Sequence, residues 1–492
     1  MTQKNYPFWP LIILSVTLAW LASYFSHGLF PIDETRYVAV AWEMWHRQSF
    51  LIPLLNGEHY SHKPPLLFWM IHLGWSLFGV NDWWPRAVPL FFSLGCLGLT
   101  AHLCGLLASQ QSLAEQTRNK YCAVLILASL WLWTIDSSLL MFDVLLTFFI
   151  LLALIGAVTA IQTQKQRGWF IYAVGVACGL LTKGPACFLY ILSFSGLFIF
   201  HQTDKRLKLT GLLLGYTFLG IGLAALWPLT IALTGNTADK VFLYHVLWTQ
   251  TVHRVANSFA HQHPFWWYLP LLPLLLLPWS VLPATWRIFK NYSALYQNTT
   301  MRILCGAILI PIIIFSCISG KQLHYLIPIL PLFSLLLAQQ QTYTVLTLKK
   351  IMIISLALIA LAQIFIAGSF YYRYDTQPIG KLLSGYEKQR QPIGFFSGRY
   401  AGEFNFSGRL IHPIHSVPRT EIPRWSQKNP DGIVVVSVRT ENPSAQQKAL
   451  YFQPYRGKYL GIWNSQNIIQ DPMLAKFLVT SGESGSGKDQ VD

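Results

Sequence analysis

Apolar segments recur along this chain at nearly regular intervals. A helix needs roughly 20 apolar residues to cross the hydrocarbon core of a bilayer. Only 11% of the 492 residues are charged, less than half of the roughly 25% found in soluble domains. Such a chain cannot cover a water-facing surface, so we predict a polytopic α-helical membrane protein. The candidate spans are about 8–26, 85–108, 121–135, 139–160, 169–182, 184–201, 210–233, 265–284, 303–318, 325–340 and 351–370.

The basic residues indicate how these spans are oriented. The net charge is +16, but Lys and Arg fall in short clusters between apolar runs, which is typical of membrane topology signals and not of nucleic-acid binding. Residues 65–79 are apolar but contain His72. If this segment does not cross, all the basic connectors lie on the cytoplasmic side, with the N-terminus inside and the C-terminus outside. These connectors are 109–120, 161–168, 202–209, 285–302 and 341–350.

The first apolar run and the cysteines exclude two other interpretations. Residues 8–26 lack a small-x-small cleavage site, so we expect a retained span and not a removed signal peptide. All seven cysteines lie within or at the ends of apolar runs. No disulfide framework or cysteine zinc cluster is therefore indicated.

The same topology predicts the domain organisation. We expect a transmembrane domain over 1–370, in which 27–84 forms a first outer loop with amphipathic helices. A β-run at 432–438, a second at 459–463 and alternation over 410–417 predict a small extracytoplasmic α/β cap over 371–480. The Gly/Ser-rich end, 481–492, is interpreted as a disordered tail. No internal repeat is present, which disfavours transporters built from repeated halves.

The unusual polar residues all map to the predicted outer face. Ionisable groups in or beside spans are costly and are candidates for function. Their convergence on one face strengthens the case for a site there. The residues are Asp33, Glu34, Arg36, Lys63, Asp143, Lys183, Arg254, Lys321 and Tyr325.

Two of these candidates lie in the first outer loop. Asp33 lies near the start of a helical pattern, where it is either the N-cap of an interfacial helix or a carboxylate that acts as a base or positions a sugar. Lys63 precedes a double proline that keeps the chain extended. Its ammonium either reaches the headgroups or binds a phosphate.

Two further candidates interrupt apolar runs. Asp143 lies one turn inside such a run, where an ionised carboxylate costs about 2.5–3.5 kcal/mol. It either has a structural partner, such as a nearby arginine, or it takes part in chemistry. Lys183 breaks another apolar stretch, either as part of a tight outer turn or as a functional cation.

The remaining candidates follow later spans. The loop 244–264 contains four histidines, which are weak indications of zinc, and Arg254, whose guanidinium suits a phosphate. Lys321 and Tyr325 lie about one turn apart at an outer helix start, which favours an anion. Tyr325 is alternatively an ordinary aromatic-belt residue. With no nucleophile constellation and no Gly-rich nucleotide loop, this set suits a lipid-linked phosphate better than a nucleotide sugar.

Seven short motifs resemble one known family. The chain is similar to the lipid-to-lipid glycosyltransferases of the GT-C superfold, above all the aminoarabinose lipid A transferases, which are related to the protein O-mannosyltransferases. The motifs are Asp-Glu-Thr-Arg-Tyr at 33–37, Pro-Leu-Leu-Asn-Gly at 53–57, Lys-Pro-Pro-Leu at 63–66, Asp143 before Leu-Thr-Phe-Phe, Leu-Thr-Lys-Gly-Pro at 181–185, Trp-Trp-Tyr-Leu-Pro at 266–270, and Ser-Gly-Lys at 319–321 with Tyr-Leu-Ile-Pro at 325–328.

This resemblance implies an inner-membrane enzyme that moves a sugar from a polyprenyl (undecaprenyl) phosphate donor to lipid A or another envelope glycolipid at the periplasmic face, with inversion. It implies about thirteen spans in place of eleven. By similarity, Asp33 is the main catalytic carboxylate and Asp143 supports it. Lys63, Arg254, Tyr325 and Lys321 bind the donor phosphate, with Glu34, Arg36 and Lys183 in support.

One departure bears on cofactors. The family usually has Glu before Lys-Pro, at a position associated with a metal, and here that residue is His62. A divalent cation is therefore left open, and no other cofactor is implied.

Three alternatives for function stay open. A protein O-mannosyltransferase-like enzyme would use a protein hydroxyl as acceptor. A transporter or flippase of a lipid-linked sugar would place ionisable residues near mid-bilayer on broken helices. A membrane-anchored scaffold would leave Lys63, Asp143 and Lys321 unexplained.

Overall fold

The computed structural model describes residues 8–202, 204–249, 262–283, 285–286, 297–340 and 343–481. The chain divides into two compact units. The first contains residues up to Tyr24 together with Ser61–Ala362, and the second contains Phe25–Tyr60 together with the chain from Gln363 onward. The interpretation of 481–492 as a disordered tail falls, after Ser481, outside the described residues.

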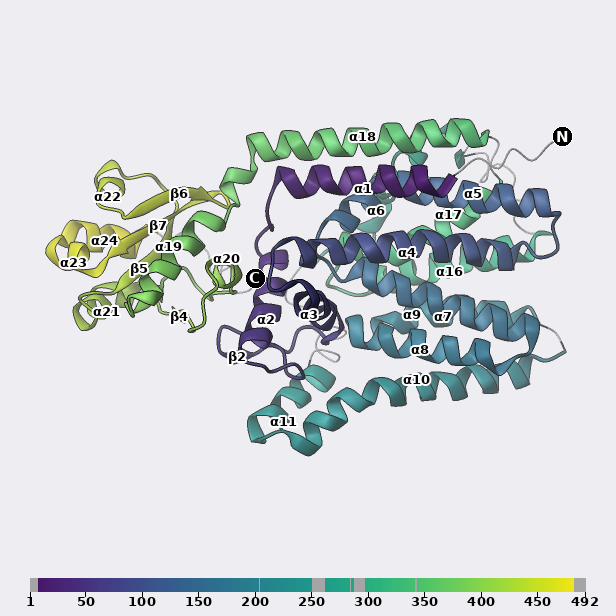
Figure 1. Cartoon of the computed structure of the whole chain (residues 1–492), viewed down its shortest axis with the longest axis horizontal. Helices are drawn as coiled ribbons and strands as arrows, with labels where there is room; N and C mark the ends of the chain where they lie inside the picture. The colour runs from purple at the N-terminus through teal and green to yellow at the C-terminus, as the bar shows by residue number, and fades with distance from the viewer. Residues whose placement is uncertain are drawn as a thin grey trace. The chain divides into compact units, whose positions relative to one another are not determined.

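The first unit is a bundle of apolar helices (Figure 1). Its core is a continuous cluster of buried Leu, Ile, Val, Ala and aromatic side chains. The helices are α1 (Phe8–Ser26), α3 (Leu66–Phe78), α4 (Trp83–Leu107), α5 (Leu113–Ser129), α6 (Trp131–Ser138), α7 (Asp143–Thr163), α8 (Gln166–Lys183), α9 (Ala186–Phe200), α10 (Arg206–Thr234), α11 (Thr237–Tyr244), α13 (Tyr268–Leu275), α16 (Thr299–Cys317), the 3-10 segment η3 (Leu323–Ile329), α17 (Leu330–Gln339) and most of α18 (Val345–Ser369).

Six of the described helices are each long and apolar enough to cross a membrane, or seven if the bent pair α5 and α6 counts as one span. Three shorter apolar helical segments, Leu66–Phe78, Ala186–Phe200 and Leu323–Gln339, accompany them. The chain is therefore a multi-pass helical membrane protein, and the number of eleven to thirteen spans stays a prediction. With 13 residues and a rise of about 1.5 Å each, α3 is shorter than the hydrocarbon core, in agreement with a segment that does not cross.

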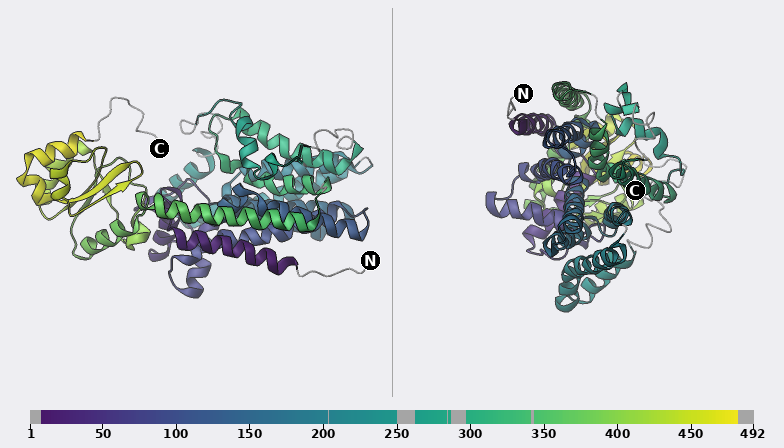
Figure 2. Two further views of the ribbon diagram at one scale, coloured as in Figure 1. Left: turned by 90° about the horizontal axis from the view of Figure 1, so that it is seen from above. Right: turned by 90° about the vertical axis from the view of Figure 1, so that its right-hand side faces the viewer.

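Small residues bring α7 and α8 into close contact. An ideal β-carbon on Gly156 would lie 2.4 Å from the backbone nitrogen of Tyr172, and one on Gly168 would lie 2.5 Å from the nitrogen of Ala160. Gly175 lies equally close to Ala153. Because hydrophobic burial adds little between helices in lipid, such close backbone packing is a main source of helix association there. The view along the bundle, on the right of Figure 2, shows that the long helices run side by side.

The second unit combines the first outer loop with the C-terminal α/β fold. The loop supplies α2 (Asp33–His46) and the hairpin of β1 (Leu54–Leu55) and β2 (Glu58–His59). The C-terminal part contains α19 (Gln377–Lys388), β3 (Ile393–Phe395), α20 (Asn405–Gly408), β4 (His415–Ser416), η5 (Arg419–Glu421), α21 (Ile422–Lys428), β5 (Ile433–Val438), α22 (Pro443–Gln447), β6 (Tyr451–Tyr455), β7 (Lys458–Asn464), α23 (Ser465–Gln470) and α24 (Pro472–Thr480).

Five strands of this unit form one mixed sheet in the order β4-β3-β5-β7-β6. The strands β4, β3 and β5 are parallel, whereas β5, β7 and β6 are antiparallel neighbours. One face packs on α19 and the other on α21 and α24, and each face has its own buried cluster. The β-runs expected at 432–438 and 459–463 correspond to β5 and β7. The alternation over 410–417 forms a strand only at His415–Ser416, because the residues before it leave the sheet.

The close packing of α7 on α8 yields a test of the fold. We expect Gly156→Ala to destabilise the protein by about 1–3 kcal/mol, because the added methyl group meets backbone atoms that cannot rotate away. The matched control is Gly196→Ala on α9, where a β-carbon meets nothing within 4 Å. Thermal unfolding in detergent measures both variants. Equal melting temperatures for the two would contradict the inferred contact.

Candidate functional site

Asp143 and Lys183 form a buried ion pair in the first unit. The Lys183 ammonium donates to Asp143 Oδ1 at 2.5 Å, and both side chains are almost fully shielded from solvent. Asp143 is the first residue of α7 and Lys183 the last of α8. Two close-packed antiparallel helices thus bring these ends together. Of the two expectations for Asp143, the structural partner is present, but it is a lysine and not an arginine.

Tyr325 lies beside this pair. The Lys183 ammonium is 5.0 Å from the centroid of the Tyr325 ring, a cation–π distance. The hydroxyl of Tyr190 donates to the backbone carbonyl of Tyr325, and that of Tyr268 donates to the carbonyl of Gln322 at 3.0 Å. These two bonds hold η3 against the bundle. Tyr190 and Tyr268 are contributors that the sequence analysis missed, because a tyrosine in an apolar run is also typical of a membrane-interface residue.

Lys63 belongs to the same group. Its ammonium lies 5.4 Å from the centroid of the Phe142 ring, next to Asp143 in the chain. Because Phe142 directly precedes Asp143, the Lys63 ammonium lies near the start of α7. The first unit therefore gathers four of the predicted residues, Asp143, Lys183, Lys63 and Tyr325, at one place. Cations outnumber the carboxylate there, so the group has the charge to receive an anion.

Lys321 has local partners of its own. Its buried ammonium donates to the carbonyls of His263, at 2.8 Å, and of Ile318. The lysine thereby ties the end of the loop 244–264 to the end of α16. Phosphate binding by Lys321 stays a prediction. Arg254, the other predicted phosphate ligand of this region, lies outside the described residues.

Asp33 opens α2 in the second unit. The N-cap position is Ile32, and the structure gives that cap no side-chain hydrogen bond. The expectation that Asp33 caps the helix is therefore wrong: the residue lies in the first turn. Its carboxylate accepts from the Arg36 guanidinium and, at 3.3 Å, from the Tyr37 hydroxyl, while 52% of its side chain remains exposed.

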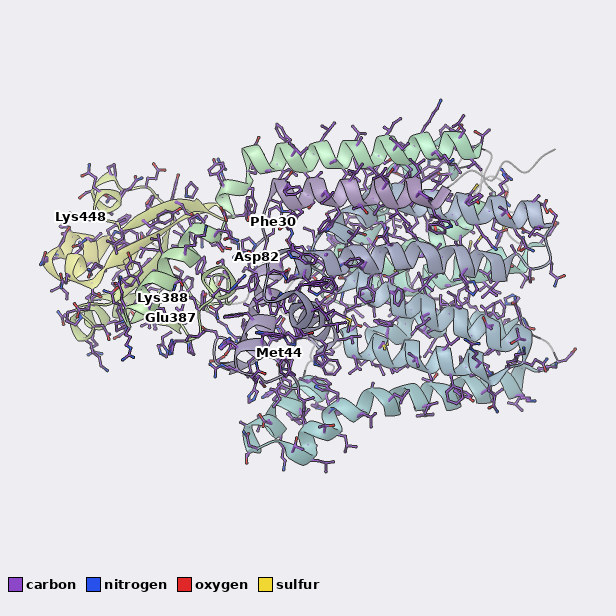
Figure 3. The ribbon with its side chains drawn as sticks, in the orientation of Figure 1. Phe30, Met44, Asp82, Glu387, Lys388 and Lys448 are labelled. Atoms are coloured by element: carbon purple, nitrogen blue, oxygen red, sulfur yellow. The ribbon has the colours of Figure 1, made fainter. Side chains whose placement is uncertain are left out.

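The other acids near α2 are buried. Glu34 accepts from the backbone N–H of Phe30 at 2.9 Å, a bond that fixes the entry to the helix; Phe30 is labelled in Figure 3. Glu403 lies buried in the turn before α20, where its carboxylate accepts from the N–H of Ala401. Burial raises the pKa of Glu403, although the charges of Arg456 and Arg36 act against this. The sequence analysis did not single out Glu403, since nothing local distinguishes it from a surface acid.

The described residues offer no ready metal centre. Among them, no three His, Cys, Asp or Glu side chains lie close enough to share an ion. His62, at the position that the resemblance associates with a metal, belongs to no such group of three in the described part of the chain. We derive no catalytic step through a metal.

Comparison with known proteins identifies relatives of the chain. A family model for dolichyl-phosphate-mannose-protein mannosyltransferases matches residues 62–231. An undecaprenyl phosphate-alpha-4-amino-4-deoxy-L-arabinose arabinosyl transferase of Pseudomonas fluorescens is 29% identical over 335 residues, and one of Sodalis glossinidius is 30% identical over 339. Each alignment covers 67% of this chain, whereas the chain spans only about 58% of either relative's length.

Solved structures show the same fold. The crystal structure of ArnT from Cupriavidus metallidurans bound to undecaprenyl phosphate superposes with a TM-score of 0.73 at 14% identity, over 92% of this chain and 97% of that one. The archaeal oligosaccharyltransferase AglB from Archaeoglobus fulgidus superposes with a TM-score of 0.50 at 11% identity, over 89% and 70%. The prediction of a helical membrane protein with a small C-terminal sheet domain and the GT-C fold is confirmed.

The buried ion pair can be tested by breaking it and then replacing it. Lys183→Met leaves the Asp143 carboxylate buried without the ammonium that donates to it, so we expect a loss of about 3–5 kcal/mol in stability. Adding Asp143→Leu removes the orphaned charge and should restore most of this loss. Thermal unfolding in detergent measures both variants. A double variant no more stable than Lys183→Met would show that the two side chains do not compensate each other.

Proposed function

We propose, on the premise that this chain is a GT-C-fold relative of the aminoarabinose transferases, that it is a glycosyltransferase that uses a polyprenyl phosphate sugar as donor. The observation that carries the proposal is the group of Lys63, Lys183, Tyr325 and Asp143 at one place in the first unit. A cation-rich group with a buried carboxylate suits a departing phosphate. The names of the relatives, which specify undecaprenyl phosphate, support the same donor class.

The reaction follows from the chemistry of the donor. An acceptor oxygen attacks the anomeric carbon from the side opposite the leaving group, and the bond from that carbon to the phosphate oxygen breaks. The bonding electrons leave with the polyprenyl phosphate, so negative charge grows on its oxygens. Cations placed in advance at these oxygens lower the barrier. In this proposal Lys63 and Arg254 bind the phosphate, with Tyr325 and Lys321 beside it.

The acceptor decides what Asp33 does. A lipid phosphate, as in an acceptor like lipid A, is already a nucleophile and needs no strong base, so Asp33 would position the substrates with Glu34 and Arg36 in support. A protein hydroxyl must lose a proton, which Asp33 would accept. The match to the mannosyltransferase family model keeps this second acceptor as the alternative. We favour the lipid acceptor because the motifs at 33–37, 63–66 and 181–185 resemble those of the aminoarabinose lipid A transferases. Relatives named as arabinosyl transferases agree with this resemblance.

The proposal places the chemistry at the periplasmic face of a bacterial inner membrane, with the α/β cap over 371–480 on the same side. The basic connectors between spans support this orientation. A flippase is disfavoured because Asp143 and Lys183 occupy helix ends and not the middle of spans. The sugar itself is not specified by any of these residues.

The first test concerns the role of Asp33. Asp33→Asn should lower the rate of sugar transfer by about 10²–10⁴-fold, the usual contribution of a proton-transferring side chain, or by less if the acceptor is already ionised. Folding should persist because the side chain is half exposed. Asp431→Asn, at an exposed acid of the same unit, is the control. Transfer by Asp33→Asn at the control's rate, measured with a radiolabelled polyprenyl phosphate sugar, would refute the assignment.

The second test concerns the donor phosphate. Lys63→Ala should weaken donor binding by about 1.5–3 kcal/mol, on the order of 10- to 100-fold, because one charge-assisted hydrogen bond is lost. The acceptor KM should change little. Lys165→Ala, at an exposed lysine of a basic connector, is the control. Titration with polyprenyl phosphate measures the effect, and unchanged affinity in Lys63→Ala would contradict this role.

A further inference from the structure

The hairpin of the first outer loop is bonded to a segment more than 350 residues away in the chain. Asn56 and Gly57 both have positive φ angles, as in the two-residue turns that Asn-Gly favours. This turn presents the Asn56 amide to the backbone of Ile414. Asn56 Nδ2 donates to the Ile414 carbonyl at 2.8 Å, and the Ile414 N–H donates to Asn56 Oδ1, also at 2.8 Å. The side chain thus pairs with a backbone as a strand neighbour would.

The same turn is bonded to α2. Glu43 Oε1, in the last part of α2, accepts from the N–H of Gly57 at 2.8 Å and forms an ion pair with Arg47, whose Nε lies 3.0 Å away. Glu43 is buried, and a buried carboxylate is costly unless it is bonded in this way. The turn therefore joins the helix on one side to the cap segment on the other.

A second bond joins α2 directly to the cap. Trp42 Nε1 donates to the carbonyl of Leu410 at 2.8 Å, and the Arg409 guanidinium lies 5.7 Å from the Trp42 ring. The backbone approaches closely as well, since a β-carbon on Gly402 would lie 2.5 Å from the Leu55 side chain. On the cap side, Glu387 of α19 accepts from the N–H groups of Ile411 and His412, which anchors the same segment (Figure 3).

We infer that Asn56, with Glu43 and Trp42, forms a loop clamp that fixes α2 to the C-terminal sheet domain and thereby positions Asp33, which makes Asn56 a positioning residue for the reaction. The clamp grips the C-terminal half of α2, and Asp33 is its first residue. About ten residues at 1.5 Å each separate them, so a rigid helix transmits any displacement over about 15 Å. The C-terminal domain is then a support for the carboxylate.

The expected effect is on turnover. Misplacement of a reacting group by about 1 Å can cost on the order of 10²-fold in rate. We expect Asn56→Ala to lower kcat at least tenfold while the KM for the donor changes less than about threefold, because Lys63, Asp143 and Lys183 belong to the other unit. The control is Asn442→Ala, which removes a side-chain bond to the N–H of Ala445 elsewhere in the same domain.

A crosslink supplies the readout that distinguishes positioning from general stability. An ideal β-carbon on Gly57 lies 3.4 Å from Cβ of Pro413, close to the roughly 3.5–4.5 Å of disulfides. The test variant adds Gly57→Cys and Pro413→Cys to Asn56→Ala, and the reference variant has the same cysteine pair with Asn56 intact. When both are oxidised, the kcat of the test variant should lie within threefold of the reference. On reduction, the kcat of the test variant should fall again. The seven native cysteines all lie in helices of the first unit. Asn56→Ala without the added cysteines therefore measures how they respond to oxidation.

The outcomes separate this inference, which rests on the proposed function, from that function. If the wild-type protein does not transfer sugar from a polyprenyl phosphate donor, the proposed function fails. Hydrogen exchange of the α2 amides then still tests the clamp, and equal exchange in Asn56→Ala and wild type overturns it. If the wild-type protein does transfer sugar, an unchanged kcat in Asn56→Ala overturns the inference alone. A low kcat that persists after the disulfide has formed also overturns it.

Discussion

The ion pair between Asp143 and Lys183 is the interaction on which the membrane unit depends. Either charge alone would be costly in an apolar bundle, and each compensates the other only if the start of α7 meets the end of α8. The small residues along these helices allow the required approach of their backbones. Close packing and charge compensation are thus two aspects of one arrangement, and the ring of Tyr325 lies against its cation.

Much of the membrane unit could be predicted from the sequence, because the signals are local. Apolar length, charge position and short motifs indicated a multi-pass helical bundle, the short α3 segment and the polar residues one by one. Their pairing could not be predicted in this way. A structural partner was one expectation for Asp143 and a tight turn one for Lys183, and both are present, but the sequence did not indicate that each side chain is the other's partner. Spacing along an apolar helix does not reveal which direction a side chain faces when every face is apolar.

The second unit shows a different limit. Its β-runs are readable, since β5 and β7 consist of β-branched and aromatic residues bounded by turns. Which parts of the chain belong to this unit could not be predicted, because the unit is built from two stretches separated by some 300 residues of chain. The bonds of Asn56 to Ile414 and of Trp42 to Leu410 connect side chains to backbone carbonyls and an N–H, groups present at every position. No pattern in either stretch marks the partner.

Asp33 and Asp143, the two carboxylates that the sequence analysis assigned to one site, lie in different surroundings. Asp143 is buried and bonded to an ammonium, so its charge serves to hold Lys183 in place. Asp33 keeps half of its surface exposed, and its neighbours Arg36 and Tyr37 are donors that leave one carboxylate oxygen without a bond in the described contacts. Pairs of acids in contrasting surroundings commonly divide their roles. The contrast supports the proposal that Asp33 is the acid that meets the substrate, whereas Asp143 holds Lys183 in place.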